Sequence, residues 1–124
     1  MIKASYDPEY NVVIVEFEGR IDAAQAEQFF SDIEKVLPKH GKSFKLLTDL
    51  SLLQSMDPNV RGTIKKAMDF FNAKGVTQVV RVIPHPDQDI GFKIMSLFHY
   101  SKEVEILTVQ SRGEAQARLK SEKK

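Results

Sequence analysis

The 124-residue chain contains no cysteine, which excludes disulfides, thiolate catalysis and thiolate metal sites and fits a reducing compartment. Its formal net charge is only +1, so long-range electrostatics give no reason to expect nucleic acid or an anionic membrane as a partner. No apolar run approaches the roughly 20 residues of a membrane-spanning helix, and the N-terminal sequence lacks the apolar core of a signal peptide. We therefore expect a cytoplasmic protein with no integral membrane segment.

Length and composition indicate a single globular domain, residues 1–124. Hydrophobic residues make up 42% of the chain and charged residues 28%, close to the averages of folded domains. A chain of this length buries roughly two thirds of the surface that its unfolded form exposes. No internal repeat, low-complexity segment or linker divides the sequence, so no second domain is expected.

The hydrophobic pattern predicts an α/β fold with a mixed, mostly parallel sheet that begins with an N-terminal hairpin. The turn-forming residues 7–11 separate the first two strands, and Gly19 is expected to end the second. Later strands and helices alternate singly, which favours right-handed crossovers and parallel pairing. In the order β-β-α-β-α-β-α-β-α, strands are expected at 2–6, 12–18, 44–51, 76–83 and 104–109, and helices after Asp22, from Pro58, at 89–100 and after Gly113.

Capping residues predict several element ends. Asp22 suits the N-cap of the first helix, and Gly75 suits the left-handed position that ends the second. Asp57 and Pro58 suit the N-cap and the first position of that second helix. The central strand before it has leucines on both faces, which predicts cover on both sides of the sheet.

A short signature in this central segment carries a resemblance to a known family. Asp49-Leu50-Ser51 followed by Met56-Asp57 resembles the Asp-Leu-Ser…Met-Asp-Ser-Ser-Gly signature of the STAS domain family, the anti-anti-sigma factor fold. Arg20-Ile21-Asp22 and Arg81-Val82-Ile83-Pro84 are similar to its SpoIIAA-like branch, often grouped with CRAL-TRIO lipid carriers. The resemblance implies a STAS-like fold and a non-enzymatic regulatory or protein-interaction role. The CRAL-TRIO association implies, as the alternative, a carrier or sensor of a small amphipathic or lipid-like ligand.

The chain departs from the family pattern at the position of the phosphorylatable serine. Asn59 stands there, with Pro58 before it and Val60 in place of the glycine that follows. Neither Pro58 nor Asn59 has a hydroxyl group, so a serine-phosphorylation switch has no acceptor at this position. Ser51 and Ser55 are the alternative acceptors nearby.

The first candidate site lies where the central strand meets the second helix, and it comprises Asp49, Ser51, Asp57 and Asn59. Unpaired amides and the dipole at a helix N-terminus favour an anion or a polar head group. The alternative is that Asp49, Ser51 and Asp57 only cap and tether the loop, each contributing ~1 kcal/mol.

Arg81 interrupts an otherwise apolar strand. Because a buried guanidinium without a partner is costly, we expect Arg81 to pair with a carboxylate such as Asp49 or to reach a solvent-lined cleft. The alternative is an arginine whose stem covers a helix while its charged end reaches water.

His85 suggests two enzyme-like alternatives at the same end of the sheet. One is a metal site, and the other is a hydrolase with Ser51, His85 and Asp49 as an acyl-transfer group. The three histidines are scattered, however, and the sequence has no metalloprotease, nucleophile-elbow or glycine-rich phosphate-loop motif. We therefore predict no catalytic residue, no metal and no cofactor.

The predicted third helix is apolar over more than one stripe. Phe92 and Met95 point away from its main apolar face, so this helix is either buried on several sides or contacts a protein partner, a second copy of the chain or a lipid-like ligand. The complete set of candidate ligand- or partner-binding residues is Asp49, Ser51, Asp57, Asn59, Arg81, His85, Phe92 and Met95.

Overall fold

The computed structural model describes residues 1–39, 41, 43–83 and 104–121. Five strands form one mixed sheet in the order β1-β2-β3-β4-β5, in which β1 is antiparallel to β2 and the later neighbours are parallel. The predicted α/β class, N-terminal hairpin and parallel pairing are confirmed. The strands are β1 (Ile2–Asp7), β2 (Val12–Ile21), β3 (Phe44–Met56), β4 (Val76–Val82) and β5 (Glu105–Val109), and the helices are α1 (Ala23–Val36), α2 (Arg61–Lys74) and α4 (Arg112–Ser121).

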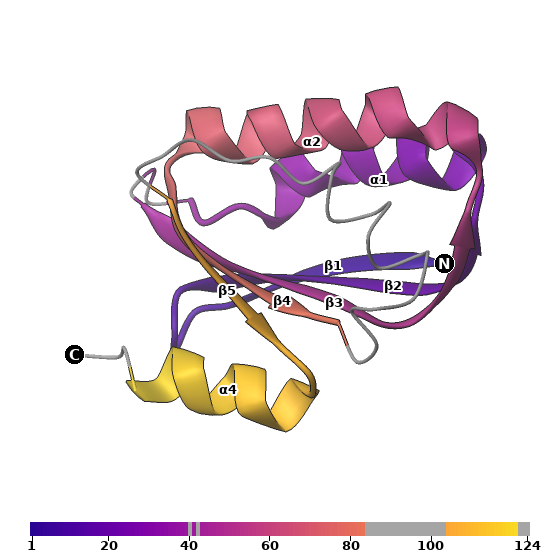
Figure 1. The fold of residues 1–124 in the computed structure, drawn as a ribbon. Coiled ribbons are helices and arrows are strands. Elements are labelled where there is room, and N and C mark those ends of the chain that lie inside the picture. The colour runs from indigo at the N-terminus through magenta and orange to yellow at the C-terminus, as the bar shows by residue number, and fades with distance from the viewer. Residues whose placement is uncertain (40, 42, 84–103, 122–124) are drawn as a thin grey trace.

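The sheet has helices on both faces. Figure 1 shows α1 and α2 over one face and α4 on the other. The larger core cluster lies under α1 and α2 and includes Leu46, whereas the smaller one lies under α4 and includes Leu47. The predicted cover on both sides of β3 is therefore confirmed.

Two of the predicted helix caps are present. The Asp22 carboxylate accepts a hydrogen bond of 2.9 Å from the Gln25 amide at the start of α1. Gly75 ends α2 with a φ of 102°, and its amide donates to the carbonyl oxygens of Phe71 and Asn72. Both caps could be predicted because they depend on local backbone geometry.

Strands β2 and β3 are longer than predicted. Gly19 does not end β2, and Ser51 does not end β3, because the two strands continue as partners of each other. Gly19 opposes Leu53 in this extension, which reaches Met56. Gly19 has a φ of 73°, a left-handed conformation that glycine adopts without steric cost.

The start of the second helix also differs from the prediction. Pro58–Val60 form a short 3₁₀ turn, η1, and α2 begins only at Arg61. The Asp57 side chain caps no helix amide, so the predicted side-chain cap is wrong. Its carboxylate instead accepts from Arg20, and its main-chain carbonyl accepts from the Val60 amide at 3.0 Å.

The predicted third helix, with Phe92 and Met95, lies outside the described residues. His85, which both the metal site and the acyl-transfer group require, also lies outside the described residues. Among the residues that are described, no group of three or more histidine, aspartate or glutamate side chains could hold a metal ion.

Candidate functional site

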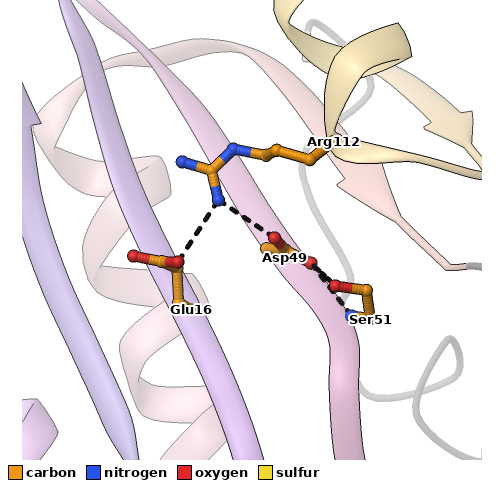
Figure 2. A network of polar contacts seen from close by, with 4 residues as sticks. All are labelled: Glu16, Asp49, Ser51 and Arg112. Atoms are coloured by element: carbon orange, nitrogen blue, oxygen red, sulfur yellow. Dashed lines mark hydrogen bonds and ion pairs between the residues drawn. The ribbon is translucent and has the colours of Figure 1, made fainter.

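The Asp49 carboxylate is the centre of a polar network on the face of the sheet that α4 covers (Figure 2). Its Oδ1 accepts hydrogen bonds from the Ser51 amide at 2.9 Å and from Ser51 Oγ at 2.5 Å. Its Oδ2 lies 3.0 Å from Nη1 of Arg112, and the same Nη1 lies 3.3 Å from Oε2 of Glu16. The Asp49 side chain is only 11% exposed, compared with 32% for Arg112 and 45% for Glu16.

A β-bulge in β3 explains why Asp49 and Ser51 meet. Asp49 opposes Glu16, but Leu52 opposes Glu18, so β3 has one more residue than β2 in this interval. A bulge leaves part of the backbone outside the regular ladder. The Ser51 amide donates to the aspartate two residues earlier, which is the contact of an Asx-type turn.

Arg112 reaches this network from the first turn of α4. The preceding Ser111 accepts from the Glu114 amide at 3.1 Å through its Oγ and therefore caps the helix. The carbonyl oxygen of Ser111 accepts from the amide of Ala115 at 3.1 Å. The network thus ties the beginning of the C-terminal helix to β2 and β3 in the middle of the sheet.

Chemically, these contacts are those of a structural tether. The Ser51 hydroxyl donates to Asp49, and both carboxylate oxygens of Asp49 already have donors. This geometry favours the tethering alternative for Asp49 and Ser51. Binding of a partner or ligand by these two residues stays a prediction.

A second polar contact holds the connection between β3 and α2. Nε and Nη2 of Arg20, at the end of β2, donate to Oδ1 of Asp57 at 3.0 Å and 2.8 Å. The Asp57 amide also donates to the Ile21 carbonyl oxygen at 2.9 Å. Pro58 and Asn59, which follow directly, are exposed. The loop is therefore anchored at its first residue and presents the next two to solvent.

The structure does not bring the two halves of the predicted site together. Asp49 and Ser51 lie within β3, whereas Asp57 and Asn59 follow its end at Met56. The predicted single pocket depended on β3 ending at Ser51. Because β3 continues along β2, the residues form two separate sites.

Arg81 lies on the opposite face of the sheet from Asp49. Arg81 pairs with Thr48 in the β3–β4 ladder, and Asp49 pairs with the next residue of β4, Val82. Side chains alternate along a strand, and Arg81 shares its face with Val79 in the core cluster under α1 and α2. The expected Arg81–Asp49 pair is therefore wrong, and Arg112 is the cation beside Asp49. Arg81 is buried, with 9% of its surface exposed.

Sequence reasoning missed three residues of these sites: Glu16, Arg20 and Arg112. A signal for Arg112 was present, because Ser111 and Glu114 have the spacing of a capping box and place Arg112 in the first helical turn. Glu16 and Arg20 carry no local signal, since their roles depend on which strand lies beside β2.

Comparison with known proteins identifies the family. The STAS domain model matches residues 5–111, so the chain belongs to the STAS domain family. No curated protein matches the chain by sequence. Within the described part of the chain, no helix is both long and apolar enough to cross a membrane.

Solved structures show the same fold. The unphosphorylated anti-sigma factor antagonist SpoIIAA is 13% identical, with a TM-score of 0.61 over 97% of this chain and 98% of that one. Phosphorylated SpoIIAA of Bacillus is 14% identical, with a TM-score of 0.61 over 96% and 99%. An uncharacterised DUF3478-family protein from Shewanella loihica PV-4 is 14% identical, with a TM-score of 0.70 over 96% and 92%. The predicted STAS resemblance and SpoIIAA-like fold are confirmed.

Proposed function

We propose that this STAS domain is a non-enzymatic regulatory module that binds a protein partner through the connection between β3 and α2. The Arg20–Asp57 contact carries the proposal, because it anchors the loop that exposes Pro58 and Asn59. A loop held in one conformation loses less conformational entropy on binding than a free one. SpoIIAA is an anti-sigma factor antagonist, and a protein of the anti-sigma class is the partner that we propose here.

The exposed side chain of Leu52 favours binding of a protein, rather than a small ion, near the connection between β3 and α2. It lies on β3 between the Asp49 network and the loop, and it is 63% exposed. An exposed apolar side chain suits the apolar centre of a protein interface, which a polar rim surrounds. Leu52 and Asn59 would therefore contact the same partner.

A capture experiment with matched variants tests the proposed surface. Wild type, Leu52→Asp, Asn59→Arg and Lys65→Glu are immobilised and exposed to lysate, and retained proteins are quantified by mass spectrometry. We expect a partner that wild type and Lys65→Glu retain and that the other two lose by about tenfold or more. Lys65 is exposed on α2 and serves as the control for a change of charge. Equal retention by all four proteins would show that the partner binds elsewhere.

We also expect no phosphorylation of the segment Asp57-Pro58-Asn59. Neither Pro58 nor Asn59 offers a hydroxyl, so a serine kinase of the anti-sigma type has no acceptor there. Incubation with such a kinase and ATP, followed by peptide mapping, measures this directly, and a STAS protein that carries the serine is the positive control. Stoichiometric phosphate on Ser51 or Ser55 would instead restore a switch in β3.

A groove between α1 and β1 favours the second candidate function, binding of a small amphipathic or lipid-like ligand. Its volume is about 440 Å³, which falls within the range of ligand sites. Its lining combines apolar residues, among them Ile2, Phe29 and Val36, with the polar Gln25, Gln28 and Asp32. Native mass spectrometry of the purified protein tests this alternative, since a carrier should retain a lipid in stoichiometric amount.

A further inference from the structure

The outer surface of α1 and α2 has two aromatic residues between charges of opposite sign. The rings of Phe30 and Phe70 contact each other edge to face with centroids 6.2 Å apart, and Phe30 remains 36% exposed. Exposed glutamates lie one turn before and after Phe30, and exposed lysines lie one turn before and after Phe70. We call this set the helix seam: Glu27, Phe30, Glu34, Lys66, Phe70 and Lys74.

The charged side chains of the helix seam have no ion-pair partner among the described residues. Both helices are fully described, and none of the four charged side chains forms an ion pair with a described residue. Lys74 places its Nζ 5.5 Å from the centre of the Phe70 ring. Within the helix seam the acidic residues lie on α1 and the basic residues on α2, while Lys35 of α1 pairs with Asp32 and the exposed Asp69 of α2 lies outside the set.

We propose that the helix seam is the interface of a symmetric homodimer, in which α1 of each copy lies along α2 of the other. Both helices connect parallel neighbouring strands and cover the same face, so they run in the same direction. A two-fold axis parallel to the helices then places Glu27 against Lys66 of the partner subunit. The same axis places Glu34 against Lys74 of the partner subunit, and Phe30 against Phe70 of the partner subunit.

The charge pattern selects this arrangement over the other two-fold docking of the same surface. An axis perpendicular to the helices would place α1 on α1, with glutamates facing glutamates and lysines facing lysines. Opposed like charges are unfavourable at an interface, whereas complementary charges set orientation. The formal net charge of +1 adds little repulsion between copies.

A second copy fits the helix seam better than an unrelated partner because the surface is complementary to itself. It carries acidic and basic stripes in equal number on either side of an apolar centre, which is the composition of a small interface. The seam lies on the layer opposite α4 (Figure 1), so the partner subunit would not contact α4.

Two double variants test the proposal by complementation. One reverses the acidic stripe (Glu27→Lys with Glu34→Lys), and the other reverses the basic stripe (Lys66→Glu with Lys74→Glu). Each variant alone should be monomeric in sedimentation velocity at ~100 µM, because all of its charged contacts become repulsive. Mixed in equal amounts they should form a heterodimer, since every contact then joins opposite charges. Wild type should dimerise, and the dissociation constant of its dimer should rise tenfold or more when the salt concentration increases from about 50 to 500 mM.

Two controls distinguish the interface from general effects of charge or folding. Lys65→Glu should leave dimerisation unchanged, because Lys65 lies about 100° around the helix from Lys66. If circular dichroism shows that a double variant is unfolded, cross-linking of wild type is used in its place. Wild type with light isotopes is mixed with wild type with heavy isotopes and treated with a zero-length cross-linker. A cross-link between Glu27 of one chain and Lys66 of the other is expected. A monomeric wild type at ~500 µM, a folded pair that does not associate on mixing, or cross-links only within chains would overturn the proposal.

Discussion

Replacing Leu119 by alanine is expected to reduce the free energy of unfolding of α4 by about 3 kcal/mol. Among the α4 side chains described, only Ala115 and Leu119 are buried, so Leu119 supplies most of the apolar contact of this helix. It packs in the smaller core cluster with residues of the sheet such as Val12 and Leu47. A space of about 140 Å³ already lies beside it, so solvent can fill part of the new cavity and the cost should stay well below the upper limit for such changes.

The loss should be local because few buried side chains hold α4 to the sheet. Helices at a domain edge can open without global unfolding, and their opening is measured by hydrogen exchange. We expect faster exchange in α4 for Leu119→Ala, while the amides of α1 and α2 remain protected. Ala117→Ser, at an exposed position of the same helix, should change neither the free energy of unfolding of α4 nor its rate of hydrogen exchange. Unchanged exchange in Leu119→Ala would mean that α4 is held mainly by its polar contacts.

The order of the described elements could be predicted because it depends on patterns within each segment. Alternating apolar residues such as Val13, Val15 and Phe17 predicted β2, and all three are buried. The caps at Asp22 and Gly75 depend on their own local backbone, so they too were correct. Local signals were sufficient wherever the neighbouring segment did not decide the conformation.

Strand lengths could not be predicted, because they depend on a partner. Gly19 and Ser51 are ordinary strand breakers by propensity, yet both lie inside strands where β2 and β3 pair beyond them. Strand preference depends strongly on the neighbouring strand, and here that context prevails over propensity. The mistaken end at Ser51 also produced the mistaken single pocket, because it placed Asp49 beside Asn59.

The partner of Asp49 shows how much depends on register. The sequence indicated that Arg81 should pair with a carboxylate such as Asp49 or reach a solvent-lined cleft. One residue of register decides which face a side chain occupies, and Arg81 lies on the wrong one. The actual partner, Arg112, is 63 residues from Asp49 in sequence and lies beyond the next two strands. Only the folded arrangement brings them together.

Removing the charge of Arg112 is expected to destabilise the protein by about 2 kcal/mol. Arg112→Met keeps much of the aliphatic stem but leaves the Asp49 carboxylate, 11% exposed, without its cation. Losing a hydrogen bond to a charged group typically costs about 1.5–3 kcal/mol. Urea titration measures the change in midpoint. Glu16→Gln is the matched control and should cost less than about 1 kcal/mol, because Glu16 is half-exposed and lies farther from Arg112.

A double-mutant cycle determines whether this loss arises from the contact with Asp49. Asp49→Asn retains an oxygen that can accept from Ser51 but removes the charge that faces Arg112. If the two side chains stabilise each other, the losses in Arg112→Met and Asp49→Asn should not add, and the coupling should reach about 1 kcal/mol or more. Additive losses would mean that Arg112 acts through packing of its stem against the sheet. In that case the network of Figure 2 would be a consequence of the position of α4 and would not hold the helix in place.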